Sequence, residues 1–188
     1  GLGHMGLYNG TGAYQTDAKF SNDSWQASMM SYFSQTQNPT TGASFAWLQT
    51  LMPADWIALN DLYSDQGFNT TNAFRGDTVY GVGTTITAEV SQIWNLFSTY
   101  ASSTAYTIVD GDGYDRLDVS NYGVNQLINL APSQLGSTVP SLSNIGGKIG
   151  NISIASGTII EAANGGSGAD SFYGNDIANT FWGNGNND

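Results

Sequence analysis

The chain has 188 residues, a net charge of −11 and no cysteine, so disulfides and thiol chemistry are excluded, while the length allows one mid-sized domain with its own core. Its four basic residues are scattered and no apolar run approaches the roughly 18 residues of a membrane span, so we expect neither nucleic acid nor membrane as a partner. Bound cations would explain the excess of acidic residues.

The N-terminal region is rich in Gly, Ser, Thr, Asn and aromatic residues and shows little helical periodicity before residue 50. Residues 53–63 are typical of a helix, because Pro53 suits a first turn and Asp55 suits the positive helix N-terminus. Apolar residues also recur there at helical spacing and predict one apolar face. They are Trp56, Leu59, Leu62 and Tyr63.

After residue 74 the sequence changes to short β-branched or apolar runs between Gly, Asn and Asp, a pattern that predicts strands. The runs are Thr78–Tyr80, Ala105–Val109, Leu117–Val119, Gln126–Leu130, Ile149–Ile154 and Thr158–Ile160. Residues 88–100 fit either a helix or a strand.

The end of the chain carries a nine-residue repeat. Residues 165–173 read Gly-Gly-Ser-Gly-Ala-Asp-Ser-Phe-Tyr, residues 174–182 follow the pattern in a degraded form, and a third unit starts at Gly183. This is the nonapeptide of calcium-binding parallel β-helices, in which glycine turns present carbonyls and the acid adds a carboxylate. A flexible Gly/Asn linker is the alternative, although linkers lack a period. Since such arrays need at least three units, we expect the parent protein to continue beyond Asp188.

A second acidic cluster lies upstream, with Asp110, Asp112 and Asp115 inside six residues. The spacing resembles the start of an EF-hand loop, but glycine stands at the fourth position and Asn121 replaces the glutamate at the twelfth. A calcium-binding turn in a β-rich context is the favoured interpretation. An exposed Asp/Gly turn is the alternative.

Five segments, in order, carry a family resemblance. Gly1-Leu2-Gly3-His4 matches the end of the metzincin zinc motif, and Ser28-Met29-Met30-Ser31-Tyr32-Phe33 matches the Met-turn. Residues 75–81, 110–118 and 161–166 complete the series. Together they resemble the serralysins, secreted zinc endopeptidases of the metzincin group with a C-terminal β-roll of calcium repeats. A cloning remnant is the alternative source of the first segment.

This resemblance implies an α+β fold in two parts. Residues 1–73 would be the C-terminal part of a metzincin catalytic domain, with loops, the Met-turn and one helix near 53–63. Residues 74–188 would be a calcium-binding region of parallel β-roll or β-sandwich-like form, with nonapeptide repeats from residue 165.

The resemblance also implies roles for single residues. With one catalytic Zn²⁺, His4 would be a ligand, Tyr32 an additional ligand that swings away to stabilise the oxyanion, and Met30 a hydrophobic floor. Several structural Ca²⁺ ions would share ligands from two adjoining turns and the first repeat. At Asp112 and Ile159 the family uses other side chains, so only the backbone carbonyls transfer. The implied calcium ligands are Phe74, Gly76, Thr78, Asp110, Asp112, Gly113, Asp115, Ile159, Glu161, Gly166, Gly168 and Asp170.

His4 is the only histidine of the chain, whereas a catalytic zinc takes three protein ligands and needs a general base. We therefore expect the chain alone to be inactive and to need an N-terminal segment that carries His-Glu-x-x-His. The predicted function is a portion of a secreted, extracellular zinc endopeptidase that acts on proteins or peptides. The alternative is a non-enzymatic calcium-binding β-roll module.

Overall fold

Short helices and strands make up the regular structure, which a computed structural model describes for residues 1–137 and 141–188. The helices are α1 (Tyr14–Asp17), α2 (Pro53–Tyr63), α3 (Ala88–Asn95) and α4 (Phe97–Tyr100), with 3₁₀ turns η1 (Ser64–Gln66) and η2 (Thr70–Asn72). The strands are β1 (Trp47–Leu48), β2 (Val79–Gly81), β3 (Thr104–Ile108), β4 (Arg116–Asp118), β5 (Leu127–Asn129), β6 (Leu142–Ser143), β7 (Ile152–Ile154), β8 (Ala162–Asn164), β9 (Ser171–Tyr173) and β10 (Thr180–Trp182).

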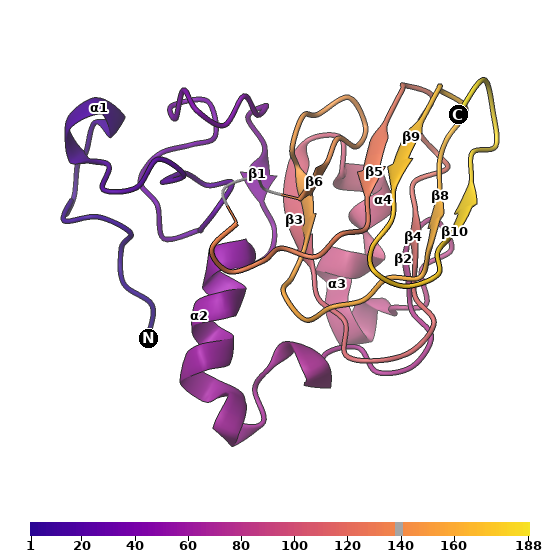
Figure 1. Ribbon diagram of the computed structural model, residues 1–188, viewed down its shortest axis with the longest axis horizontal. Coiled ribbons are helices and arrows are strands. Elements are labelled where there is room, and N and C mark those ends of the chain that lie inside the picture. Colours follow the sequence, from indigo (N-terminus) through magenta and orange to yellow (C-terminus); the bar gives the residue numbers. More distant parts are fainter. Residues whose placement is uncertain (138–140) are drawn as a thin grey trace.

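The strands form mostly parallel sheets whose neighbours are far apart in sequence. One sheet has the order β10-β8-β4-β2, a second has the order β1-β3-β7-β6, and β5 pairs with β9. All the pairs are parallel except β6 with β7. Figure 1 shows the N-terminal loops at one end of the molecule and the strands at the other. This mixture of few helices and parallel sheets agrees with the α+β prediction.

Helix α2 confirms the predicted helix, with the same bounds. Pro53 occupies its first turn, and the carboxylate of Asp55 accepts a hydrogen bond from the Met52 N–H at 2.9 Å, which caps the helix start. Its apolar face is only half-buried, and Leu62 is 50% exposed. Trp56, Leu59 and Tyr63 line a mainly apolar groove of about 590 Å³ together with residues 66–73.

Five of the six predicted strand runs contain a strand, namely β2, β3, β4, β5 and β7. The prediction of a strand at 158–160 is wrong. These residues are not in a strand, and β8 begins only at Ala162. The Thr158 N–H donates to the Ala155 carbonyl at 3.1 Å in a turn, and the Ile160 carbonyl accepts side-chain amides. These groups are therefore not free for a strand ladder. Residues 88–100 are helical, as α3 and α4.

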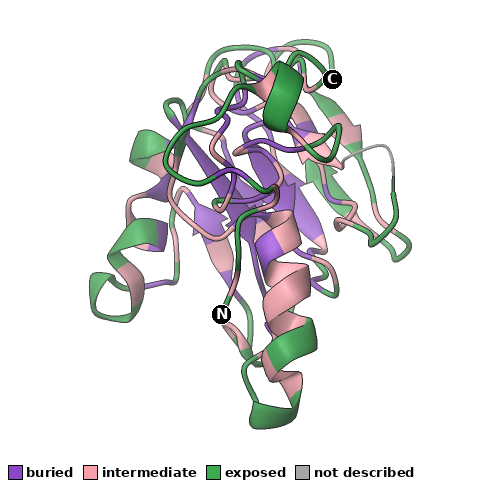
Figure 2. Ribbon diagram, turned by 90° about the vertical axis from the view of Figure 1, so that its left-hand side faces the viewer, coloured by how far each residue is buried: buried purple, intermediate pink, exposed green. Residues whose placement is uncertain are grey.

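One hydrophobic cluster fills the space between the strands and the helices α3 and α4. Inward-facing residues of β2, β4 and β8 meet those of β3, β5 and β7, and Trp94, Phe97 and Ala101 cover them from the helical side. Figure 2 shows these central strands as the buried part of the molecule. Among these residues, the Tyr80 hydroxyl lies within hydrogen-bond distance of two acceptors, the Val109 carbonyl at 2.8 Å and the Asp110 carboxylate at 2.7 Å.

Strand β1 joins the N-terminal region to this core. Trp47 and Leu48 pair in parallel with Thr104 and Ala105 at the start of β3. The buried side chains of Ala46 and Met52 pack with Ala105 in a second, smaller cluster. The loop-rich region is thereby anchored on the sheet that it precedes.

Gly81 offers a test of how closely β2 and β4 approach. Its φ is +118° and a Cβ there would overlap the Asp118 carbonyl, whereas Gly83, with φ +71°, faces open space. Both changes to alanine lose about 1 kcal/mol through the left-handed backbone. We expect Gly81→Ala to lose roughly 3 kcal/mol or more, since strand backbones must move apart. Thermal unfolding of both variants measures this, and equal losses would contradict the close approach.

Candidate functional site

Two tyrosine rings, those of Tyr8 and Tyr32, gather around His4 near the N-terminus. The Nδ1 atom of His4 lies 3.1 Å from the Tyr8 carbonyl, and its ring centroid lies 4.7 Å from that of Tyr32. The Tyr8 and Tyr32 rings are 4.6 Å apart, and the Tyr32 hydroxyl accepts the Gly10 N–H at 3.0 Å. His4 itself is exposed. The structure therefore brings together His4 and Tyr32, which the family resemblance had paired.

Asp23 holds this aromatic group in place. It is fully buried, and its carboxylate accepts the Tyr8 hydroxyl at 3.0 and 3.1 Å and the Ser31 hydroxyl at 2.6 Å. Burial and the bond to Asp23 raise the pKa of Tyr8, which therefore stays a donor. Asp23 thus connects the segment after His4 to the turn that carries Tyr32. The sequence gives no signal for this role, because its partners lie 15 and 8 residues away in irregular chain.

Asp55 fastens the turn that contains Met30 to the start of α2. Its carboxylate accepts the Ser28 hydroxyl at 2.5 Å and the Met29 N–H at 2.8 Å, besides the Met52 N–H. The Met30 N–H in turn donates to the Ser28 hydroxyl at 3.0 Å, and the Met30 side chain is half-buried. The sequence predicted that Asp55 lies at the start of a helix, but it did not predict the contacts of Asp55 with residues 28 and 29.

The acids Asp110, Asp115 and Glu161 meet at one edge of the sheet β10-β8-β4-β2. Asp115 accepts the Thr78 N–H at 2.7 Å and gives its own N–H to the Glu161 carboxylate at 2.7 Å. Asp110 is 2% exposed, and one of its carboxylate oxygens accepts the Tyr80 hydroxyl. Its other oxygen, Oδ1, is buried and has no hydrogen-bond partner in the described chain. An orphaned buried carboxylate oxygen calls for a cation or a proton.

Burial sets the charge state of this cluster in the absence of a cation. Desolvation raises the pKa of Asp115 to about 8, and the negative charges of Asp110 and Glu161 reinforce that rise. Desolvation also raises the pKa of Asp110. The ion pairs found among the described residues, Arg75 with Asp112 and Arg116 with Asp118, involve other acids. Within residues 1–137 and 141–188, the structure therefore gives no ion pair to Asp110, Asp115 or Glu161.

The neighbouring turn supplies backbone oxygens. The Thr78 hydroxyl lies 3.0 Å from the Gly76 carbonyl and 3.4 Å from the Phe74 carbonyl, so these three oxygens converge. A Cβ on Gly113 would lie 2.5 Å from the Gly76 carbonyl carbon, so the two turns touch through their backbones. Within the described residues, no three or more His, Cys, Asp or Glu side chains form a metal site by themselves. A cation here would need carbonyls as well, as calcium commonly does.

Asp112 and Ile159 lie apart from the buried acids. The exposed Asp112 carboxylate accepts the Gly76 N–H at 3.0 Å and pairs with Arg75 at 3.1 Å. These contacts lower the pKa of Asp112, the Gly76 bond most strongly. Ile159 is 49% exposed. Neither side chain contributes to the cluster, so only their backbone carbonyls stay as predicted ligands.

The first nonapeptide forms a similar turn at the opposite ends of the strands. The Asp170 carboxylate accepts the Gly166 N–H at 2.6 Å and the Gln126 N–H at 2.7 Å, and the Asp170 N–H donates to Asp188 at 2.7 Å. A Cβ on Gly166 would overlap the Tyr122 carbonyl, and one on Gly168 would lie 2.5 Å from the Val124 backbone. These glycines let successive turns stack in contact. Gln126 and Asp188 were not predicted as partners of Asp170.

The strand register explains these contacts. The residue just before a strand lies opposite its equivalent before the neighbouring strand. The side chains of Asp115, Glu161 and Asp170 accept the backbone N–H of that equivalent residue. The β8 and β10 strands pair two nonapeptides apart, while β9, between them in sequence, pairs with β5 in another sheet. The residues in this position are Thr78, Asp115, Glu161 and Asn179 at one edge and Gln126 and Asp170 at the other.

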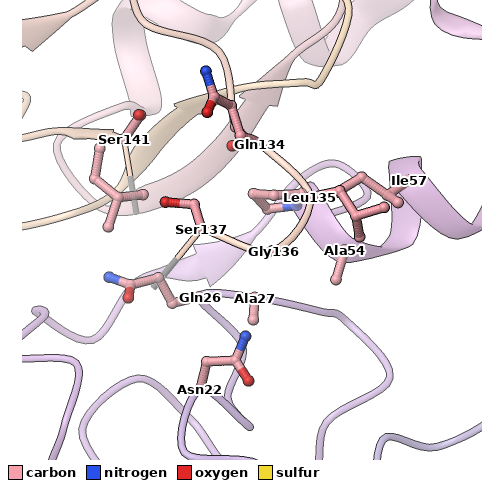
Figure 3. A pocket seen from close by; sticks show the side chains of 13 residues that line it. Asn22, Gln26, Ala27, Ala54, Ile57, Gln134, Leu135, Gly136, Ser137 and Ser141 are labelled. Carbon is pink, nitrogen blue, oxygen red and sulfur yellow. The ribbon is translucent and has the colours of Figure 1, made fainter. Parts of the chain in front are cut away.

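A separate pocket of about 230 Å³ lies between residues 22–27, the start of α2 and the segment after β5 (Figure 3). Gln26, Ala54 and Leu135 are among its lining residues. The described residues that line it include no acid, base or histidine. It therefore offers no proton-transfer chemistry and lies outside the candidate site.

Comparison with known proteins places this geometry in a family. The family described as Peptidase M10 serralysin C terminal matches residues 69–187. The chain belongs to the serralysin family. Metallopeptidase AprA of Pseudomonas marginalis is 36% identical over 186 residues, which cover 96% of this chain and 36% of that protein. Serralysin of Photorhabdus luminescens is 34% identical over 187 residues, which cover 96% and 35%. The chain spans about a third of these serralysin relatives.

Across residues 1–137 and 141–188, none of the helices of this serralysin chain has the length and apolar character of a membrane span.

The raised pKa of Asp115 predicts how stability depends on pH when cations are removed. In the folded state this pKa is about 8, against about 4 in an unfolded chain. The folded state therefore binds more protons between these values, and the free energy of unfolding falls as the pH rises through them. In chelator we expect a higher melting temperature at pH 6 than at pH 8.5.

Two variants isolate the group responsible. Asp115→Asn should lose most of this pH dependence and melt higher than the unaltered chain at pH 8.5 in chelator. Asp112→Asn is the control, because its pKa is lowered rather than raised and it does not titrate in this range. Melting temperatures of Asp115→Asn that still fall steeply with pH would contradict the assignment.

Proposed function

We propose that this chain is the C-terminal portion of a secreted zinc-dependent endopeptidase that hydrolyses peptide bonds in proteins. The observation that supports it best is the orientation of His4, whose Nδ1 faces the Tyr8 carbonyl beside Tyr32. A zinc-bound histidine commonly gives its other ring N–H to a carbonyl, which leaves Nε2 for the metal. The His4 surroundings therefore fit a zinc ligand.

The zinc, when bound, would polarise the scissile carbonyl and activate a water molecule. His4 would hold it through Nε2, and Met30 would supply the hydrophobic floor that the family resemblance implies. Tyr32, whose hydroxyl is held by the Gly10 N–H, would be an additional ligand and then a hydrogen-bond donor to the oxyanion. With one histidine in 188 residues, the remaining ligands and the general base would come from a polypeptide segment that carries His-Glu-x-x-His.

Several calcium ions would stabilise residues 74–188. The orphaned oxygen of Asp110 and the raised pKa values of Asp110 and Asp115 support a cation at this edge. Its ligands would come from the converging oxygens of residues 74–78 and 110–115, with an adjoining site at Gly113, Asp115, Ile159 and Glu161. At the other edge, Gly166, Gly168 and Asp170 would hold a further ion, with Asp188 close to it.

We also propose the division of the chain into a catalytic part, 1–73, and a calcium-binding parallel β-roll, 74–188. The alternation of β8, β9 and β10 between two sheets supports the roll. An extracellular location follows from the proposed calcium requirement. A non-enzymatic calcium-binding module remains the second candidate function, and the same acidic turns would serve it.

A chimaera tests the catalytic proposal. This chain would replace the matching third of Metallopeptidase AprA of Pseudomonas marginalis, and hydrolysis of a protein substrate and bound zinc would be measured. We expect an active, zinc-containing chimaera. His4→Ala should lose zinc and activity, and Tyr32→Phe should lower kcat about 100-fold, as removal of one oxyanion donor does.

Tyr173→Phe serves as the control, because Tyr173 is exposed and lies in the first repeat. A folded chimaera in which His4→Ala keeps its zinc and its full activity would leave only the module function.

Calcium should raise the melting temperature of the chain itself. Ligand at about 100 times its dissociation constant adds about 2.7 kcal/mol, which corresponds to roughly 5–10 °C for a chain of this size. Asp110→Asn and Asp170→Asn should each lose part of that gain, because each removes a carboxylate from a different proposed site. An equal melting temperature in calcium and in chelator would refute the calcium sites.

A further inference from the structure

The second nonapeptide, residues 174–182, places an amide where the first has a carboxylate. In the first unit the Gly166 N–H donates to the Asp170 carboxylate at 2.6 Å. In the second, the Asn175 N–H donates to Oδ1 of Asn179 at 2.9 Å. Since both contacts join residues four apart at the same repeat positions, Asp170 and Asn179 lie in equivalent turns.

The remaining atom of each side chain faces an opposite kind of partner. In Asp170 it is an oxygen, which accepts the Gln126 N–H at 2.7 Å. In Asn179 it is the Nδ2 amide, which donates to the Ile160 carbonyl at 3.2 Å and lies 3.4 Å from the Glu161 carbonyl. The bond from the Asn175 N–H to Oδ1 fixes this orientation of the amide.

Asn175 adds a second amide to the same place. Its Nδ2 donates to the Ile160 carbonyl at 2.9 Å, and its Oδ1 accepts the Asn179 amide at 3.0 Å and the Ile177 N–H at 3.2 Å. The pattern requires glycine at position 175, and the asparagine there supplies the donor that glycine lacks. The two amides together form what we call the amide clamp, Asn175 and Asn179.

The amide clamp does not fit the calcium ion that the repeat pattern implies. Calcium needs six to eight oxygen ligands, and here N–H groups already occupy the Ile160 carbonyl and face the Glu161 carbonyl. Asp176, the acid of residues 174–179, is exposed. We infer that the second nonapeptide closes its turn with the amide clamp and takes no calcium. This inference rests on the proposed function, in which the Asp170 turn does take calcium.

The amide clamp would give the end of the roll a link that persists without cations. It holds residues 160 and 161 against residues 175–179, next to the bond from the Thr180 N–H to the Glu161 carbonyl at 2.9 Å that begins the β8–β10 pairing. The Asp170 turn, in contrast, presents carboxylates to its neighbours. One edge of the repeat would therefore be ordered before calcium arrives, and the other only afterwards.

Asn179→Asp tests this inference in the 188-residue chain. The carboxylate would face the Ile160 and Glu161 carbonyls and the Asn175 Oδ1, so acceptors would oppose acceptors. In chelator we expect the melting temperature to fall by about 5 °C and hydrogen exchange at Thr180 to rise. Calcium should restore the melting temperature, and calcium bound per chain should rise by about one. Asn22→Asp is the control, because Asn22 is exposed and far from the repeat in sequence.

The outcomes separate this inference from the proposed function. If the unaltered chain binds no calcium, the proposed sites fail, while loss of Thr180 protection in Asn179→Asp with chelator still supports the amide clamp. If Asn179→Asp behaves as Asn22→Asp does in chelator and binds no additional calcium, the amide clamp is refuted. Asn179→Ala removes the donors without adding charge. In this variant, Thr180 should lose its protection from hydrogen exchange in chelator, and calcium should not restore it.

Discussion

Side chains that lie between one turn and the next hold the parallel strands in register, because the strands themselves span only two to five residues. In the turns before β2, β4 and β5, a backbone N–H donates to the acid of the following turn, at Asp115, Glu161 and Asp170 respectively. A slip by one residue would break these bonds and also turn the core residues outward. The residues just before these strands therefore hold the strands in register, and they include the acids of the proposed cation sites.

This arrangement concentrates acids in closely stacked turns. A Cβ on Gly166 or Gly113 would collide with the neighbouring backbone, and the ion pairs found among the described residues do not involve Asp110, Asp115 or Glu161. Protons or cations must then balance this negative charge. The raised pKa of Asp115 indicates that, without a cation, its carboxyl group binds a proton instead. The scarcity of Lys and Arg and the net charge of −11 agree with the proposed function, in which a cation between turns would take the place of an ion pair.

Local patterns predicted what is local in this structure. The proline and the acid at the start of α2 and the spacing of apolar residues were enough to place that helix, and the nine-residue period was enough to single out Asp170. The strand prediction at 158–160 is wrong, because a strand-like composition cannot show that the Thr158 N–H bonds the Ala155 carbonyl in a turn and that side-chain amides occupy the Ile160 carbonyl. The roles of Asp23 and Gln126 were not predicted for a related reason. Their partners belong to segments that only the tertiary fold brings near.

Burial alone does not determine which acids need a cation, and the comparison of four buried carboxylates shows what does. Asp23 and Asp55 are as buried as Asp110, but hydroxyls reach both oxygens of Asp23, and a hydroxyl and backbone N–H groups reach those of Asp55. Asp170 also has both oxygens bonded, but its own N–H meets a second carboxylate, that of Asp188. Oδ1 of Asp110 has no donor among the described residues, and Asp110 lies beside the acid Asp115. A carboxylate with a full set of neutral donors links two segments without a cation. A carboxylate with an orphaned oxygen or an acidic neighbour is the one that a bound cation would stabilise most.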